Sequence, residues 1–112
     1  MLTITAIVQV KKGYEIAMRE ALLEVVSSVR ANEPAIVGYY ISQDATDSCV
    51  FTTCERYVDR AAMDRHNNSE AIVRFFGIAK PLIDGEVTLV TGTERSAQSS
   101  DQVMMNLSGC AG

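Results

Sequence analysis

Residues 36–57 read IVGYYISQDATDSCVFTTCERY. Two runs rich in β-branched and aromatic residues, 36–43 and 49–57, flank the polar segment 44–48. A short polar turn between two such runs is typical of an antiparallel β-hairpin. The sequence therefore predicts a hairpin in the middle of the chain.

A strand and a helix are predicted before this hairpin. Residues 2–10 alternate, with apolar side chains at every even position, which favours a strand with one apolar face. Residues 14–31 change to a spacing of three and four, which is typical of an amphipathic helix. Pro34 ends this helix, because the residue before a proline is disfavoured in the helical region.

A second helical region and a last strand are predicted after the hairpin. Asp59 is a candidate N-cap for a second helical region, which Asn67–Ser69 interrupt and which Pro81 and Gly85 close. Residues 86–94 again favour a strand. The order β-α-β-β-α-β predicts an α+β, ferredoxin-like fold with a four-stranded antiparallel sheet and two helices on one face.

We expect this domain to span residues 1–95. The tail, 96–112, is rich in Ser, Gln and Gly, and we expect it to be loosely ordered or docked on a partner subunit.

A sheet covered on one face exposes apolar side chains on the other. We expect Ile7 there, together with one of two rows of the second strand: either Val37, Tyr39 and Ile41, or Ile36 and Tyr40. Apolar patches of this kind usually mark an interface. A homodimer formed through the two sheet faces would bury them.

Composition excludes several classes of partner. The 112 residues carry ten basic and fourteen acidic side chains, and no basic run exceeds Lys11-Lys12, so a nucleic-acid interface is not expected. No run approaches the roughly 20 apolar residues of a membrane helix. Residues 1–10 lack the pattern of a signal peptide, which favours a cytoplasmic protein.

Two stretches carry a resemblance to a known family. The first, Glu33-Pro34-Ala35-Ile36-Val37-Gly38-Tyr39, is similar to a Glu-Pro-Gly-Cys-Leu-x-Tyr signature. The second matches the pattern Phe-x₃-Glu-x-Trp-x-Asp followed by Ala, His and Ser, at Phe51, Glu55, Tyr57, Asp59, Ala62, His66 and Ser69. On these residues the chain resembles the antibiotic biosynthesis monooxygenase family. Ala35, Ile36 and Tyr57 depart from the usual Gly, Cys and Trp.

The resemblance implies a dimeric α+β barrel and a monooxygenase that oxidises a small electron-rich aromatic, such as a quinol or polyphenol, with dioxygen and without a cofactor. His66, the only histidine, is the candidate catalytic base, and Glu55 is the carboxylate that would orient it. The candidate substrate contacts are Phe51, Tyr39, Tyr57 and Phe76.

Other interpretations of the same residues remain open. A single histidine cannot form a multi-histidine metal site, and no glycine-rich phosphate loop is present, so neither a metal nor a nucleotide cofactor is expected. The Glu55–His66 pair would equally serve a proton-shuttling isomerase. The chain would also suit a non-catalytic dimer that binds a small ligand, with His66 hydrogen-bonded at a helix end and the aromatic residues packed in the core or interface.

Overall fold

The computed structural model describes residues 1–96. Its elements, in chain order, are β1 (Leu2–Gln9), α1 (Glu15–Asn32), β2 (Ile36–Gln43), β3 (Val50–Tyr57), α2 (Arg60–Asn67), α3 (Glu70–Ala79), a 3₁₀ turn (Lys80–Leu82) and β4 (Thr88–Thr93). Apart from Ser96, the tail expected at 96–112 lies outside the described residues.

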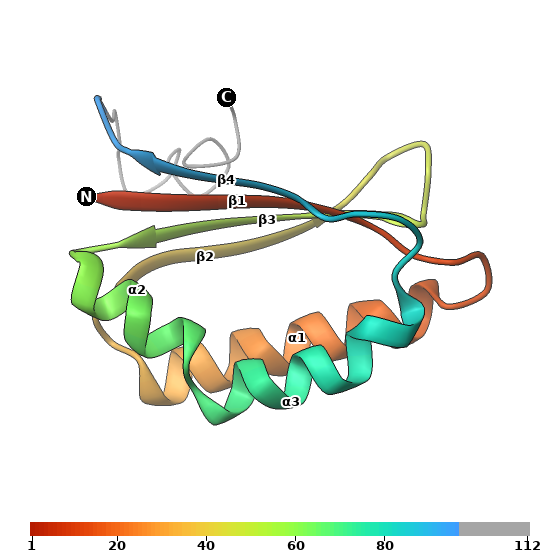
Figure 1. Ribbon diagram of the computed structural model, residues 1–112, viewed down its shortest axis with the longest axis horizontal. Helices are drawn as coiled ribbons and strands as arrows, with labels where there is room; N and C mark the ends of the chain where they lie inside the picture. Colours follow the sequence, from red (N-terminus) through yellow and green to blue (C-terminus); the bar gives the residue numbers. More distant parts are fainter. Residues whose placement is uncertain (97–112) are drawn as a thin grey trace.

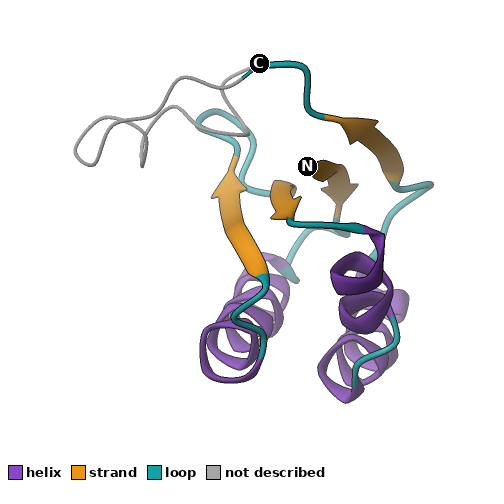
Figure 2. Ribbon diagram, turned by 90° about the vertical axis from the view of Figure 1, so that its left-hand side faces the viewer, coloured by secondary structure: helices purple, strands orange, loops and turns teal. Residues whose placement is uncertain are grey.

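The strands form one antiparallel sheet in the order β2-β3-β1-β4. The sheet makes one layer and the helices the other (Figure 1). Figure 2 shows α1 and the α2–α3 pair side by side beneath the same face of the sheet. The predicted ferredoxin-like α+β fold is therefore confirmed.

The region predicted as the second helix consists of two helices, α2 and α3. Asn68 ends α2, and Ser69 begins α3 by accepting a hydrogen bond from the Ile72 N–H at 3.3 Å. The Ser69 hydroxyl also donates to the His66 carbonyl at 2.7 Å, which ties the two helices together. The interruption expected at Asn67–Ser69 is thus a short junction within one helical layer.

The core lies between the sheet and the helices. The even positions of β1 from Ile4 to Val8, and Val10 just after the strand, are buried on the helical side, as their alternation predicts. Helix α1 contributes buried side chains at helical spacing: Met18, Ala21, Leu22, Val25 and Val29. Phe51 of β3 and Met18 of α1 are fully buried and belong to the same hydrophobic cluster. Burial of these aliphatic and aromatic side chains holds the two layers together.

A bulge in β2 decides which of its side chains face the helices. The register against β3 shifts between Ile36 and Gly38. After the shift, Tyr39 pairs with Glu55 and Tyr40 pairs with Cys54. Tyr39 and Tyr40 therefore point to opposite faces of the sheet. Ile36 and Tyr39 therefore both pack toward the helices, so neither of the two predicted rows forms intact.

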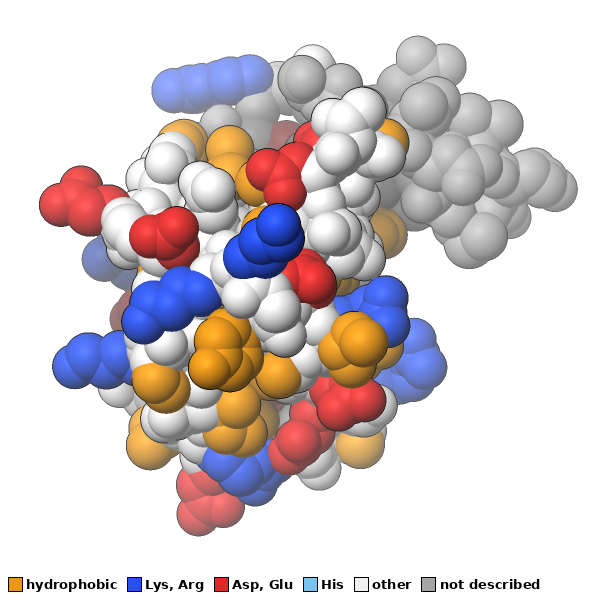
Figure 3. Space-filling view, turned by 90° about the vertical axis from the view of Figure 1, so that its right-hand side faces the viewer, with side chains coloured by type: hydrophobic (Ala, Val, Ile, Leu, Met, Phe, Trp, Pro, Cys, Tyr) orange, Lys and Arg blue, Asp and Glu red, His pale blue; other side chains and the backbone are white. Residues whose placement is uncertain are grey.

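The opposite face of the sheet is not covered by the helices, and Ile7, Val37 and Val90 are exposed large apolar residues of its strands. At the end of the molecule shown in Figure 3, hydrophobic side chains on the helical half stand among charged ones. Within residues 1–96, no helix combines the length and the apolar character needed to cross a membrane.

Candidate functional site

The end of α1 places a carboxylate beside α2. Glu33 leaves the helix with φ −129°, because Pro34 follows it, yet its N–H still donates to the Val29 carbonyl at 2.9 Å. Both Glu33 carboxylate oxygens lie 3.2 Å from His66 Nδ1. A carboxylate only accepts hydrogen bonds, so Nδ1–H is the donor.

His66 lies in the last turn of α2, on the side that faces the sheet. The Asp59 side chain caps this helix by accepting from the Ala62 N–H at 2.9 Å, which sets where its turns begin. Ala62 and Met63, four and three residues earlier, are buried on the same side. The His66 residue is 1 % exposed.

Glu55 approaches the other edge of the imidazole from β3. Its Oε1 is 3.9 Å from His66 Nε2. The Tyr57 hydroxyl donates to the same oxygen, and the Thr53 hydroxyl donates to Oε2 at 3.0 Å. Because alternate strand residues share a face, Thr53, Glu55 and Tyr57 all point toward the helices. We call Glu33, Glu55, Tyr57 and His66 the His66 cluster.

Arg56, the neighbour of Glu55 on β3, points the other way. It lies on the side of the sheet away from the helices and makes two hydrogen bonds of 2.9 Å to Glu94. The inward carboxylate of Glu55 is therefore satisfied by hydroxyl groups and by the imidazole, rather than by an arginine.

Two tyrosine rings enclose His66. Its ring centroid lies 5.2 Å from that of Tyr39 and 5.9 Å from that of Tyr57. Burial, reinforced by the Glu55 carboxylate, raises the pKa of both phenols far above the ordinary tyrosine value. Both side chains therefore act as neutral phenols, and the Tyr57 hydroxyl is a hydrogen-bond donor rather than a base.

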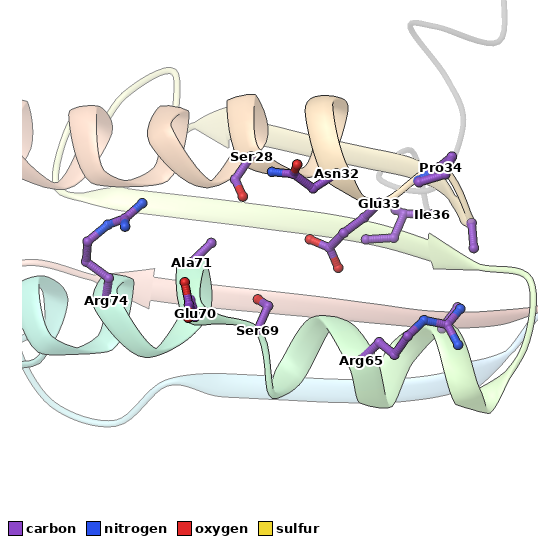
Figure 4. Close-up of a pocket in the computed structure, with 12 residues that line it drawn as sticks. Ser28, Asn32, Glu33, Pro34, Ile36, Arg65, Ser69, Glu70, Ala71 and Arg74 are labelled. Atoms are coloured by element: carbon purple, nitrogen blue, oxygen red, sulfur yellow. The ribbon is translucent and has the colours of Figure 1, made fainter.

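A cleft of about 650 Å³ opens beside the cluster. One wall is the end of α1 and the start of β2, and the other is α2 with the start of α3 (Figure 4). Glu33 belongs to this lining, and its side chain is 16 % exposed. The buried imidazole thus meets the cleft through the Glu33 carboxylate.

The structure separates the residues predicted for the site. His66, Glu55, Tyr39 and Tyr57 come together in one buried group. Phe51 packs in the core with Val8 and Met18 at some remove from this group. Phe76 is 56 % exposed on α3, because its neighbour Phe75 takes the inward position. The cleft lining consists of other residues, so substrate contact by the four aromatic side chains stays a prediction.

Glu33 is the member of the cluster that the sequence did not reveal. It belongs to the Glu-Pro pair that carries the family resemblance, but no sequence pattern assigns it a role. A charged residue held at a helix end by a following proline, in a chain with one histidine, was the available signal. The contact spans 33 residues, so no local pattern displays it.

The model of the family described as antibiotic biosynthesis monooxygenase matches residues 1–77, a range that contains the whole His66 cluster. The chain belongs to the antibiotic biosynthesis monooxygenase family. Its fold agrees with a crystal structure of an antibiotic biosynthesis monooxygenase at TM-score 0.79 and 25 % identity, covering 86 % of this chain and 100 % of that one.

Two further solved structures resemble this family member. A protein from Pseudomonas aeruginosa is similar at TM-score 0.77 and 28 % identity, over 85 % of this chain and 94 % of that one. A putative antibiotic biosynthesis monooxygenase from Nitrosomonas europaea has the same fold at TM-score 0.79 and 21 % identity, over 86 % of this chain and 100 % of the other. A comparison with the curated proteins finds no match.

The raised pKa of Tyr57 predicts a loss of stability in alkali. Above the ordinary tyrosine pKa of about 10, the unfolded chain ionises this phenol while the folded chain keeps it neutral, so the free energy of unfolding falls as pH rises. Tyr57→Phe removes this titration. We expect the variant to be less stable near neutral pH, because Glu55 loses a donor, and the difference from wild type to narrow in alkali. Urea unfolding at a series of pH values measures both curves, and parallel curves would contradict the assignment.

Proposed function

We propose that this family member is a cofactor-independent monooxygenase that oxidises an electron-rich phenol with dioxygen. One observation carries the proposal: a buried imidazole bonded at 3.2 Å to a carboxylate that lines a cleft of about 650 Å³. A cleft of this size is in the range of sites that hold small organic ligands. Family membership supports the reaction class.

The first step is removal of the phenolic proton. A general base must lie within hydrogen-bonding reach of the proton it takes. Two carboxylates of the described residues line this cleft, Glu33 and Glu70, and Glu33 is the one that is hydrogen-bonded to the buried imidazole. In the proposal, Glu33 accepts the proton and His66 positions Glu33 through Nδ1–H. Glu55 holds the far edge of the ring, with Tyr57 and Thr53 fixing Glu55 in turn.

The second step is attack of the phenolate on dioxygen. The phenolate passes one electron to dioxygen, and the two radicals combine at a ring carbon that bears a hydrogen atom. The peroxide anion so formed takes back the proton that Glu33 holds, which gives a hydroperoxide and restores the Glu33 carboxylate. Loss of water from that carbon leaves a carbonyl group, so a phenol and dioxygen give a quinone and water. One oxygen atom enters the product, the other leaves as water, and the substrate supplies all four electrons.

We further propose that two copies of the chain pair through the sheet faces that the helices leave uncovered. The exposed apolar residues Ile7, Val37 and Val90 support this arrangement, because burying exposed apolar side chains is stabilising. Pairing of sheets would leave the cleft open, since the cleft lies on the helical side.

Ile7→Lys tests this pairing. A lysine at this position of the sheet face would be buried without a partner, so we expect the mass in solution, measured by light scattering, to fall from that of a dimer to that of one chain. Leu23→Lys, at an exposed position of α1, is the matched control and should keep the wild-type mass. A wild-type protein with the mass of a single chain would refute the pairing.

Oxygen uptake tests the reaction. The purified protein, freed of metal by chelator and shown to lack flavin absorbance, is given a panel of quinols in an oxygen electrode. We expect protein-dependent oxygen consumption with at least one quinol, and a loss in kcat/KM of about a hundredfold or more in Glu33→Gln. His66→Asn should reduce the rate as well, because Glu33 loses the donor that positions it.

Glu20→Gln is the matched control, because it removes a carboxylate from an exposed position of the same helix. Its rate should equal that of the wild type. If Glu33→Gln consumes oxygen as fast as Glu20→Gln, the proposed base is wrong. If a substrate is converted equally well without oxygen, the protein is an isomerase and not an oxygenase.

A further inference from the structure

The walls of the cleft are largely polar. Side chains that carry hydroxyl, amide or charged groups line it at Ser28, Asn32, Glu33, Arg65, Ser69, Glu70 and Arg74. In the part of the chain that the structure describes, no aromatic side chain contributes to the lining. A bare hydrocarbon ring would leave these polar groups without partners, so the lining favours a ligand with polar groups of its own.

Two guanidinium groups border the cleft. Figure 4 places Arg65 of α2 at one end and Arg74 of α3 at the other, with Glu33 between them. Arg74 is occupied, because its Nη2 lies 2.7 Å from Glu24 Oε1. Within residues 1–96, no carboxylate forms an ion pair with Arg65. Arg65 therefore presents an available guanidinium at the edge of the cleft.

The carboxylates of the cleft leave room for an anion at the Arg65 end. Glu33 is bonded to His66, and Glu70 lies in the first turn of α3, beside Ser69 and toward Arg74 in Figure 4. A guanidinium group suits a carboxylate, because its planar N–H groups match the two oxygens. An anion at Arg65 would hold the rest of a ligand over Glu33.

We propose that the substrate is an anionic phenol, an aromatic ring that bears a carboxylate as well as its hydroxyl group. Arg65 binds the carboxylate, and the hydroxyl group reaches the Glu33 carboxylate. The role of the hydroxyl group rests on the proposed function, whereas the binding of the carboxylate by Arg65 does not depend on any reaction.

Binding of a matched pair of ligands tests the proposal. Gentisate is a hydroquinone with one carboxylate, and gentisamide is the same molecule with a neutral amide in its place. Calorimetric titration of the full-length protein without oxygen measures both dissociation constants. Because hydrogen bonds to a charged group are stronger than neutral ones, we expect gentisate to bind on the order of tenfold more tightly. Added salt should weaken that preference.

Variants assign the preference to one side chain. Arg65→Gln should bind the two ligands equally, and Arg65→Lys should keep part of the preference because it keeps the charge. Arg60→Gln is the matched control: Arg60 lies on the same helix, is paired with Asp64 at 3.6 Å and is not part of the cleft lining. It should keep the full preference. Equal binding of both ligands by the wild type, or an unchanged preference in Arg65→Gln, would overturn the proposal. A preference lost only in Arg74→Gln would also overturn it.

The absence of oxygen keeps this test separate from the proposed reaction. If gentisate is preferred through Arg65 but no phenol supports oxygen uptake, the anion site stands and the monooxygenase proposal fails. If quinols are oxidised but the carboxylate brings no preference, the reaction stands and the anionic substrate is wrong.

Discussion

The contact between His66 Nδ1 and the Glu33 carboxylate is the constraint around which the site is arranged. A polar ring and carboxylates taken out of water are costly unless each is paired. Here the imidazole lies between Glu33 and Glu55, and hydroxyl groups satisfy Glu55. Leaving a buried hydrogen-bonding group without its partner typically costs about 1–3 kcal/mol. The contact therefore also fastens the end of α1 to α2, on either side of the cleft.

Much of the fold can be predicted from the sequence, because local sequence patterns determine its helices and strands. Alternation along residues 2–10 marks β1, and Pro34 marks the end of α1. The bulge in β2 is harder to predict from the sequence, since the shift between Ile36 and Gly38 depends on how the strand pairs with β3. Phe75 and Phe76 illustrate the same difficulty on a helix. Both are apolar and adjacent, so the sequence does not distinguish them. Only packing in the folded protein decides that Phe75 points inward.

The site can be predicted only in part, because tertiary contacts bring its residues together. Glu55 and His66 stand out individually, as a carboxylate within a strand and a single histidine. Strand alternation predicts that Arg56 points away from Glu55, because neighbours on a strand face opposite sides. Glu33 joins them only through the tertiary fold. The polar character of the cleft is likewise hidden, since its lining is drawn from α1, β2, α2 and α3 together.

Because one fold hosts many reactions, the account of function depends on the His66 cluster and not on the fold. NMR of the imidazole nitrogens is the most direct measurement, since the chain contains one histidine and its signals need no assignment. The account predicts that Nδ1 carries a proton that exchanges slowly with water, and that Glu33→Gln shifts this resonance. A ring whose Nδ1 lacks a proton, or whose proton exchanges as fast as in the unfolded chain, would contradict it.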